Sequence, residues 1–168
     1  EAKEINDQCK GNELKSDDIA KMVLLDSFVK EALRLNADLL GVPHKCLSEP
    51  YYTFSNGYQI PNGRVIMLNF LEITGDEELQ GQNPQQFNAY RHLERNSNAT
   101  KLERNFVIFG SGKHACPGRF YAVRVMKIFF HKIILKYHIR AETEKISKKH
   151  IGSLIAPLKT NIVFENRD

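Results

Sequence analysis

Apolar residues recur at helical spacing in two long stretches of the chain. The first begins at Ser16-Asp17-Asp18, a sequence typical of a helix N-terminal cap, and continues to about Leu35. Its apolar positions, which favour burial on more than one side, are Ile19, Met22, Val23, Phe28, Ala32, Leu33 and Leu35. The second stretch follows Pro117-Gly118, where a helix would begin, and its apolar positions are Phe120, Val123, Val125, Met126, Ile128, Phe129, Ile133 and Ile134. We therefore expect two long helices, the first of them largely buried.

The rest of the chain predicts short strands and irregular segments. Residues 51–54, 58–60 and 64–68 are expected as strands, with Pro61-Asn62-Gly63 as a turn. Residues 69–80 are expected as a helix, and an irregular stretch rich in Asn and Gln follows through Arg104. After the second long helix, residues 137–141 and 161–165 indicate two strands with a turn at 152–157 between them. The predicted fold class is therefore mainly α with small β-sheets (α+β).

The composition is that of one globular domain with a core, since 42% of the 168 residues are hydrophobic and 26% are charged. No run approaches the ~20 apolar residues of a membrane span. The three cysteines, Cys9, Cys46 and Cys116, do not indicate a secreted disulfide framework, which favours a reducing, cytosol-facing location.

Positive charge is concentrated between Asn105 and Ala141, a segment without Asp or Glu. Its basic residues are Lys113, Arg119, Arg124, Lys127, Lys132, Lys136 and Arg140. A basic surface of this kind steers an acidic partner through its field, and the alternative is an ordinary solvated helix face. No nucleic-acid partner is expected, because no recognition motif accompanies the charge.

A glycine-rich loop with a single cysteine precedes the second long helix; it reads Phe109-Gly110-Ser111-Gly112-Lys113-His114-Ala115-Cys116-Pro117-Gly118. The start of a helix favours an anion, so the helix dipole would help Cys116 to act as a thiolate, the form that ligates haem iron. Glycines without Cβ atoms let such a loop bring its backbone close to a sulfur and a flat macrocycle. Phe109 would shield the thiolate from water, and His114 would donate to an anion such as a haem propionate.

The loop has three other interpretations. A lone cysteine near glycines is often a buried small hydrophobe. A phosphate-binding loop is disfavoured, because Val107 stands where its first glycine belongs and His114 stands where Ser or Thr would coordinate magnesium. A structural zinc site is disfavoured, because no second ligand pair follows His114 and Cys116.

The loop resembles the signature of the cytochrome P-450 haem-thiolate monooxygenases, Phe-x-x-Gly-x-(Arg or His)-x-Cys-x-Gly, and its continuation to Ala122 is similar to the fungal form. Glu31-Ala32-Leu33-Arg34 matches the family's Glu-x-x-Arg motif, and Phe87-Asn88-Ala89-Tyr90-Arg91 matches the Phe-x-x-x-Arg pattern whose arginine joins that pair. The resemblance covers essentially the whole chain but only the C-terminal portion of the family. We therefore interpret residues 1–168, which begin at Glu1 without a methionine, as a single partial domain and a fragment.

The resemblance implies haem b as cofactor and Cys116 as its iron ligand. The implied cofactor-binding residues are Phe109, Gly110, Gly112, His114, Pro117 and Gly118. His44 lies near where the family places a basic residue on a haem propionate, although an ordinary loop histidine explains it equally well. Glu31, Arg34 and Arg91 would form the family's structural motif. No catalytic residue is assigned, because the family's oxygen-activating acid–alcohol pair precedes the segment that corresponds to residue 1.

The implied activity is insertion of one oxygen atom from O2 into an apolar organic substrate, although this piece alone is expected to be inactive. The alternative is a non-catalytic haem-binding relic or sensor. Residues expected to contact substrate, each of which also fits a core position, are Leu39, Leu40, Val42, Leu154 and Ile155. The implied partner is an acidic NADPH-dependent reductase on the basic face, and the implied location of the whole protein is the cytosolic face of the endoplasmic reticulum membrane.

Overall fold

The computed structural model of the chain describes residues 1–9, 13–37, 40–143, 148–151, 154–157 and 161–167. Its helices are α1 (Ala2–Cys9), α2 (Ser16–Ala20), α3 (Val23–Leu35), α4 (Phe70–Gly75), α5 (Glu77–Gln80) and α6 (Arg119–Lys136), with a 3-10 turn η1 at Gly112–His114. Its strands are β1 (Leu40–Lys45), β2 (Tyr51–Thr53), β3 (Gln59–Pro61), β4 (Val65–Asn69), β5 (Tyr137–Ala141), β6 (Lys148–Ile151), β7 (Leu154–Pro157) and β8 (Ile162–Asn166).

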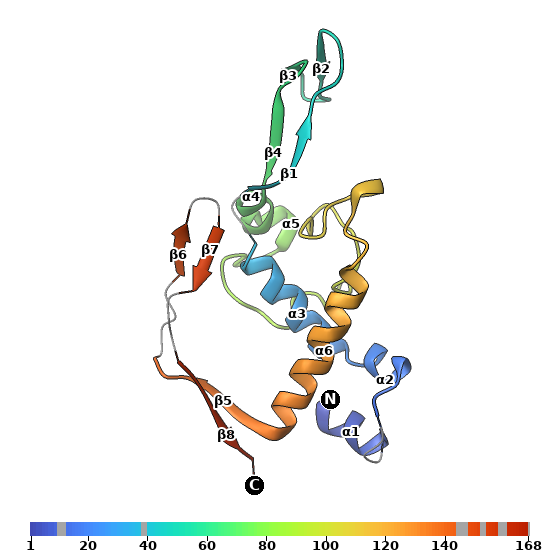
Figure 1. The fold of residues 1–168 in the computed structure, drawn as a ribbon, viewed down its shortest axis with the longest axis vertical. Helices are drawn as coiled ribbons and strands as arrows, with labels where there is room; N and C mark the ends of the chain where they lie inside the picture. Colours follow the sequence, from blue (N-terminus) through green and yellow to red (C-terminus); the bar gives the residue numbers. More distant parts are fainter. Residues whose placement is uncertain (10–12, 38–39, 144–147, 152–153, 158–160, 168) are drawn as a thin grey trace.

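Helices α3 and α6 pack against each other in the middle of the molecule (Figure 1). The contact is built on Val29 of α3 and Val123 of α6, with Ala99 from the irregular stretch between them. The predicted single helix 16–35 is wrong in one respect, because it is divided into α2 and α3 at Lys21–Met22. Met22 leaves the helical conformation, with φ −75° and ψ 69°, and its side chain is fully buried. The break therefore lets Met22 join the core formed with Ile5, Ile19 and Leu25.

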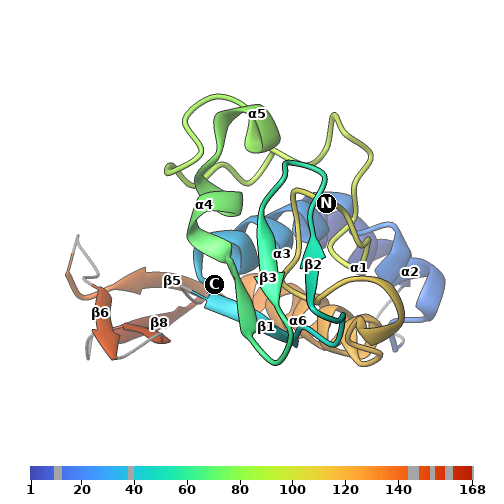
Figure 2. The same cartoon turned by 90° about the horizontal axis from the view of Figure 1, so that it is seen from above.

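A long ribbon projects from this body (Figures 1 and 2). Strands β1 and β4 pair antiparallel at its base, with an irregular register between Gly41 and His44, and β2 pairs with β3 at its far end. Gly41 lies tightly against α4, because a Cβ there would be 2.5 Å from the ring of Phe70. The base of the ribbon is thereby held on the body.

The predicted helix 69–80 is divided into α4 and α5 by Asp76. Asp76 has an extended backbone, and its Oδ1 accepts a hydrogen bond of 3.0 Å from the N–H of Leu79. An aspartate in this role is a helix N-cap, so the second helix begins there. Residues 81–111 then run without a helix or strand longer than an isolated bridge, as predicted for the irregular stretch.

The C-terminal region holds two antiparallel strand pairs, β5 with β8 and β6 with β7. The predicted turn at 152–157 is wrong for residues 154–157, which form β7 because β6 supplies its backbone partners; residues 152 and 153 lie outside the described part. In the described ranges, no helix is both long and apolar enough to cross a membrane. The predicted α+β class, helices with small sheets, is confirmed.

Candidate functional site

The cysteine loop is a compact turn that exposes the thiol of Cys116. The backbone N–H of Cys116 donates to Phe109 O at 2.7 Å, which closes the loop on itself. Gly110 and Gly112 have positive φ angles of 74° and 58°, a conformation that other residues adopt only with strain. A Cβ at Gly112 would meet nothing within 4 Å, so this glycine is needed for its backbone angle and leaves open space beside the loop.

The loop is anchored on both sides. Phe109 packs on the cluster formed by Val29, Ala99 and Val123, and its ring lies edge-on to Phe106 at 6.2 Å. At the other side, the Arg119 guanidinium donates to Thr100 O at 3.0 Å and to Cys116 O at 2.9 Å. The position of the thiol therefore depends on α6 and on residues 97–106.

The chemistry of the loop fits an iron held in a macrocycle. Cys116 is a soft, exposed ligand at the start of an 18-residue helix, where an anion is favoured. Among the residues that the structure describes, no three His, Cys, Asp or Glu side chains are grouped to hold a bare metal ion. A cofactor such as haem would supply the other ligands of an iron bound to Cys116.

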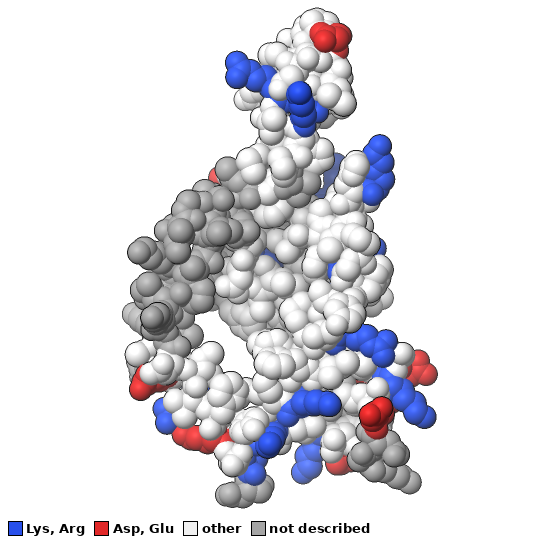
Figure 3. Space-filling view, viewed as in Figure 1, with Lys and Arg blue, Asp and Glu red and all other residues white. Residues whose placement is uncertain are grey.

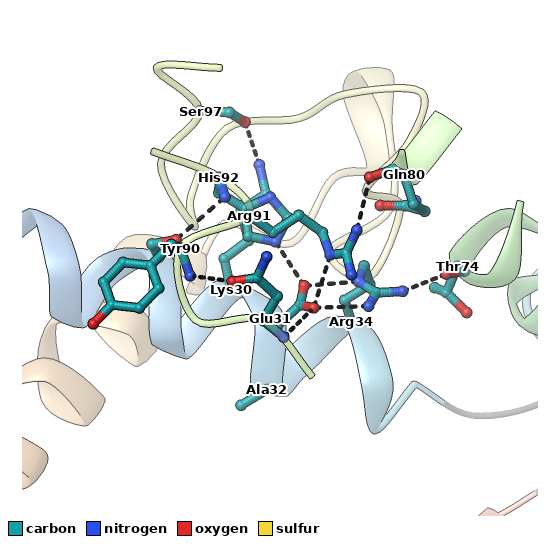
Figure 4. A network of polar contacts seen from close by, with 12 residues as sticks. Lys30, Glu31, Ala32, Arg34, Thr74, Gln80, Tyr90, Arg91, His92 and Ser97 are labelled. Carbon is teal, nitrogen blue, oxygen red and sulfur yellow. Dashed lines mark hydrogen bonds and ion pairs between the residues drawn. The ribbon is translucent and has the colours of Figure 1, made fainter. Parts of the chain in front are cut away.

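A second group of predicted residues centres on Glu31, which is fully buried and accepts hydrogen bonds from three side chains (Figure 4). Arg34 donates from Nε to Oε2 and from Nη2 to Oε1, both at 2.8 Å. Arg91 Nε donates to Oε1 at 2.9 Å, and His92 Nε2 lies 3.0 Å from Oε2. The N–H of Asn88 also donates to Oε1, at 3.1 Å. The structure thus brings together Glu31, Arg34 and Arg91, which the sequence motifs pointed to.

The electrostatics of the cluster favour an ionised carboxylate. Burial by itself raises the pKa of Glu31, but the hydrogen bonds from Arg34, His92 and Arg91 outweigh it and hold this pKa well below its usual range. A buried carboxylate is tolerated here because each oxygen accepts at least two hydrogen bonds.

The arginines extend the cluster into the backbone of the irregular stretch. Arg91 donates from Nη1 to Gln80 O and Gln82 O, each at 3.0 Å, and from Nη2 to Asn83 O and Gln86 O. Arg34 Nη1 donates to Thr74 O (Figure 4). The bonds to Gln82, Asn83 and Gln86 satisfy carbonyls in a segment that has no regular structure of its own, whereas those to Thr74 and Gln80 reach the last turns of α4 and α5. The cluster therefore fixes the path of the irregular stretch relative to these helices.

A second ion pair, which the sequence analysis did not find, ties the next part of that stretch to α3. Lys30 is fully buried and lies 2.8 Å from Glu103 Oε2, and it also donates to Ser97 Oγ. Burial lowers the pKa of Lys30. Burial by itself would raise the pKa of Glu103, but the hydrogen bonds from Lys30, Ser97 and Lys101 outweigh it and lower this pKa to about 2. No local signal identifies Lys30, because its partners lie 67 and 73 residues away.

The remaining predicted site residues lie on other elements. His114 is exposed in η1, and His44 is exposed on β1 opposite Ile66. Leu40 and Val42 belong to β1, Leu154 and Ile155 belong to β7, and Leu39 lies outside the described residues. Pro117 and Gly118 immediately precede α6, and a Cβ at Gly118 would be 3.9 Å from the sulfur of Cys116.

The basic segment forms a less continuous surface than the sequence indicated. Lys127 is buried and pairs with Asp26 at 3.2 Å. The Arg119 guanidinium donates its hydrogen bonds to Thr100 O and Cys116 O. Figure 3 shows Lys and Arg at several separate places on one face, including the lower end of the molecule and the projecting ribbon. Arg140 is exposed but pairs with Glu165, and the other exposed basic residues of the segment are Lys113, Arg124, Lys132 and Lys136.

The profile of the family named Cytochrome P450 matches residues 2–164. Cytochrome P450 monooxygenase 71 of Postia placenta is 34% identical over 160 residues, which is 89% of this chain and 31% of that protein. Cytochrome P450 monooxygenase avaL of Aspergillus versicolor is 34% identical over 151 residues, 83% of this chain and 27% of that protein.

Solved structures show the same fold. The crystal structure of the cytochrome P450DA heme domain matches with a TM-score of 0.78 at 19% identity, covering 99% of this chain and 36% of that one. The chain thus spans about a third of the length of these relatives. Because the family profile extends over nearly all of the 168 residues, the chain belongs to the cytochrome P450 family.

Proposed function

We propose that this chain supplies the thiolate side of a haem b site in a monooxygenase that inserts one oxygen atom from O2 into an apolar organic substrate. The observation that carries the proposal is the exposed Cys116 thiol, presented by a loop with two left-handed glycines at the start of α6. Haem with a thiolate ligand would supply the chemistry, since the thiolate's electron density favours O–O cleavage.

The loop residues would have separate roles in this site. Cys116 would hold the iron, and Gly110 and Gly112 would give the cofactor close access to the backbone. Phe109 would hold the loop on the core, where its ring is packed. His114 would donate to a haem propionate, and His44 is proposed for the same role from β1. Pro117 and Gly118 would set the start of α6 and so the direction of its dipole.

The substrate contacts are assigned to apolar residues of two strands. Leu40 and Val42 of β1, Leu154 and Ile155 of β7, and Leu39, which precedes β1, suit an apolar ligand by residue type. The cytosolic face of the endoplasmic reticulum membrane is proposed as the location of the whole protein.

An acidic NADPH-dependent reductase is the proposed electron donor, and the exposed Lys113 in η1 and Arg124 on α6 are the residues proposed to steer it. Reversing both charges should slow reduction several-fold at low salt, with the difference fading as salt screens the field. Lys45→Glu, on the projecting ribbon, is the matched control. Equal reduction rates for the double reversal and this control would rule out steering by these two residues.

The test of the proposed function is spectroscopic. The chain is titrated with haem, reduced and exposed to carbon monoxide, beside Cys116→Ala and the control Cys46→Ala. A thiolate-type Soret band in the wild type and in Cys46→Ala, lost in Cys116→Ala, is the expected result. An unchanged spectrum in Cys116→Ala would refute the ligand assignment. Haem binding without substrate oxidation by the whole protein, after reductase and NADPH are added, would favour the relic or sensor.

A further inference from the structure

We propose that His92 is a positioning residue of the Glu31 cluster, and that it holds residues 80–104 against α3 only while its imidazole is neutral. The sequence motifs that led to Glu31, Arg34 and Arg91 contain no residue at this position, and its role was not foreseen from the sequence. The inference goes beyond the proposed function, because it concerns the closure of the protein and not the chemistry of the cysteine.

The geometry defines which nitrogen of His92 carries the proton. Its Nε2 lies 3.0 Å from Glu31 Oε2, and a carboxylate only accepts hydrogen bonds, so Nε2 is the donor. The backbone N–H of His92 donates to Ser27 Oγ at 3.3 Å, which fixes the residue on α3 from its other side. The side chain is only 2% exposed. A neutral imidazole with its proton on Nε2 therefore satisfies the contact with Glu31.

The second nitrogen makes a charged His92 costly. Nδ1 is buried and has no hydrogen-bond partner among the described residues. A proton on Nδ1 would be a buried N–H donor without an acceptor, which is among the expensive defects of a folded protein. Neutral His92 leaves only a lone pair there.

The surrounding charges act in the same direction. Arg34 and Arg91 already share the Glu31 carboxylate. The positive charges of Lys30 and Arg34, both on α3, also lower the pKa of His92. His92 also lines a cavity of about 800 Å³, whose other charged residues are Asp26, Arg124 and Lys127. Asp26 is already paired with Lys127, so it is not a free counterion for a charged His92. Burial lowers the pKa of His92, and the bond to Glu31 only partly opposes this.

Opening of the 80–104 segment must therefore be linked to proton uptake. In the closed state the pKa of His92 lies below the 6.5 of a free imidazole, whereas in the open state it returns to that value. The open state thus binds more protons below about pH 6.5, and the closed state loses stability there. One linked proton changes the opening equilibrium by at most about tenfold per pH unit between the two pKa values.

The segment leads directly into the cysteine loop. Thr100 O accepts from Arg119, whose other bond is to Cys116 O. Ala99 packs beneath Phe109 and donates its N–H to Asp26 at 2.7 Å. Loss of the His92 contact would therefore release the support of Cys116 without any change in the loop sequence.

Hydrogen exchange of peptides from residues 80–104 tests the proposal, with protection factors corrected for the intrinsic pH dependence of exchange. The wild type is expected to lose roughly tenfold in protection between pH 7.5 and 5.5. His92→Gln keeps an amide donor toward Glu31 but does not titrate, so its protection should be close to the wild-type value at pH 7.5 and flat with pH. His92→Leu should lose roughly tenfold or more at pH 7.5, because a hydrogen bond to a charged group is gone, and should also be flat.

His131→Gln is the matched control. His131 is also buried, its Nδ1 also lacks a partner in the described part of the chain, and burial also lowers its pKa, but it lies on α6 and lines a different cavity with Asn6 and Glu13. This variant should keep the wild-type pH dependence in residues 80–104. A pH dependence that persists in His92→Gln, or that disappears equally in His131→Gln, would overturn the proposal.

A measurement on the unmodified chain keeps the idea testable if a variant does not fold. The ¹⁵N chemical shifts of the imidazoles report tautomer and charge directly. His92 should show the Nε2–H tautomer at pH 7.5 and should remain neutral at a pH where a free histidine is half protonated. A His92 that titrates at or above 6.5, or that carries its proton on Nδ1, would overturn the proposal.

Discussion

Replacing Glu31 by Gln removes the charge that compensates two buried guanidinium groups and leaves the shape of the side chain almost unchanged. Arg34 is fully buried and the Arg91 side chain is 6% exposed, so neither can recover its hydration. The glutamine amide has one acceptor oxygen, whereas the glutamate carboxylate has two. If its oxygen occupies the Oε1 position, its NH2 group faces the donors of Arg34 Nε and His92 Nε2.

The size of the effect follows from this arrangement. Breaking a buried ion pair by neutralising one partner costs about 3–5 kcal/mol, because the other charge stays buried without a counterion. The stability of a whole domain is typically about 5–15 kcal/mol, so Glu31→Gln should remove a large part of it. We therefore expect a free energy of unfolding lower by about 3–5 kcal/mol in this variant.

Urea unfolding followed by circular dichroism measures the difference, with Glu165→Gln as the control. Glu165 also pairs with an arginine, at 2.9 Å from Arg140, but these side chains are 54% and 59% exposed. An exposed pair of this kind contributes about 0.2–1 kcal/mol. If the two variants lose the same stability within 1 kcal/mol, the reasoning from burial and uncompensated charge is refuted.

Two further perturbations test other parts of the fold. Because the native pKa of Glu103 is about 2 and its ordinary value is 4.5, its pairing with Lys30 stabilises the protein above pH 4.5 and is lost as the pH falls toward 2. Unfolding free energies measured from pH 5 to 2.5 should therefore fall more steeply in the wild type than in Glu103→Gln, and parallel curves would contradict this. Gly41→Ala should cost about 1–3 kcal/mol, because the new Cβ would lie 2.5 Å from the Phe70 ring. Phe70→Leu in the same chain should recover part of that loss, whereas additive losses in a double-mutant cycle would show that the two side chains do not clash.

Local features of the chain were well predicted from the sequence. Pro117 and Gly118 marked the start of α6, which begins at Arg119, and the strand and turn residues between 51 and 68 lie close to the observed strands. Glu31 and Arg34 are three residues apart, so their proximity needs only a helix. Helix starts, turns and i,i+3 pairs depend only on residues close together in the chain, so they can be predicted from the sequence.

Features that depend on distant partners were missed. Lys30 looks like a solvent-facing residue in an amphipathic pattern, and only Ser97 and Glu103 explain its burial. The break at Met22 follows from the core that this side chain joins, and β6 carries Lys148-Lys149-His150, which has no apolar alternation. His92 carries no local signal of its role, because its effect arises from Glu31, 61 residues earlier.

The Glu31 carboxylate also imposes an order of assembly during synthesis. Its bonds to Arg34 close within one helical turn, but those to Arg91 and His92 close loops of 60 and 61 residues. The longer closures carry a greater entropic cost and require the irregular stretch to have left the ribosome. Until then the Glu31 carboxylate has Arg34 as its partner but lacks the donors of Arg91 and His92. We therefore expect α3 to dock on the nascent chain no earlier than the arrival of residues 91 and 92 and of its packing partner α6.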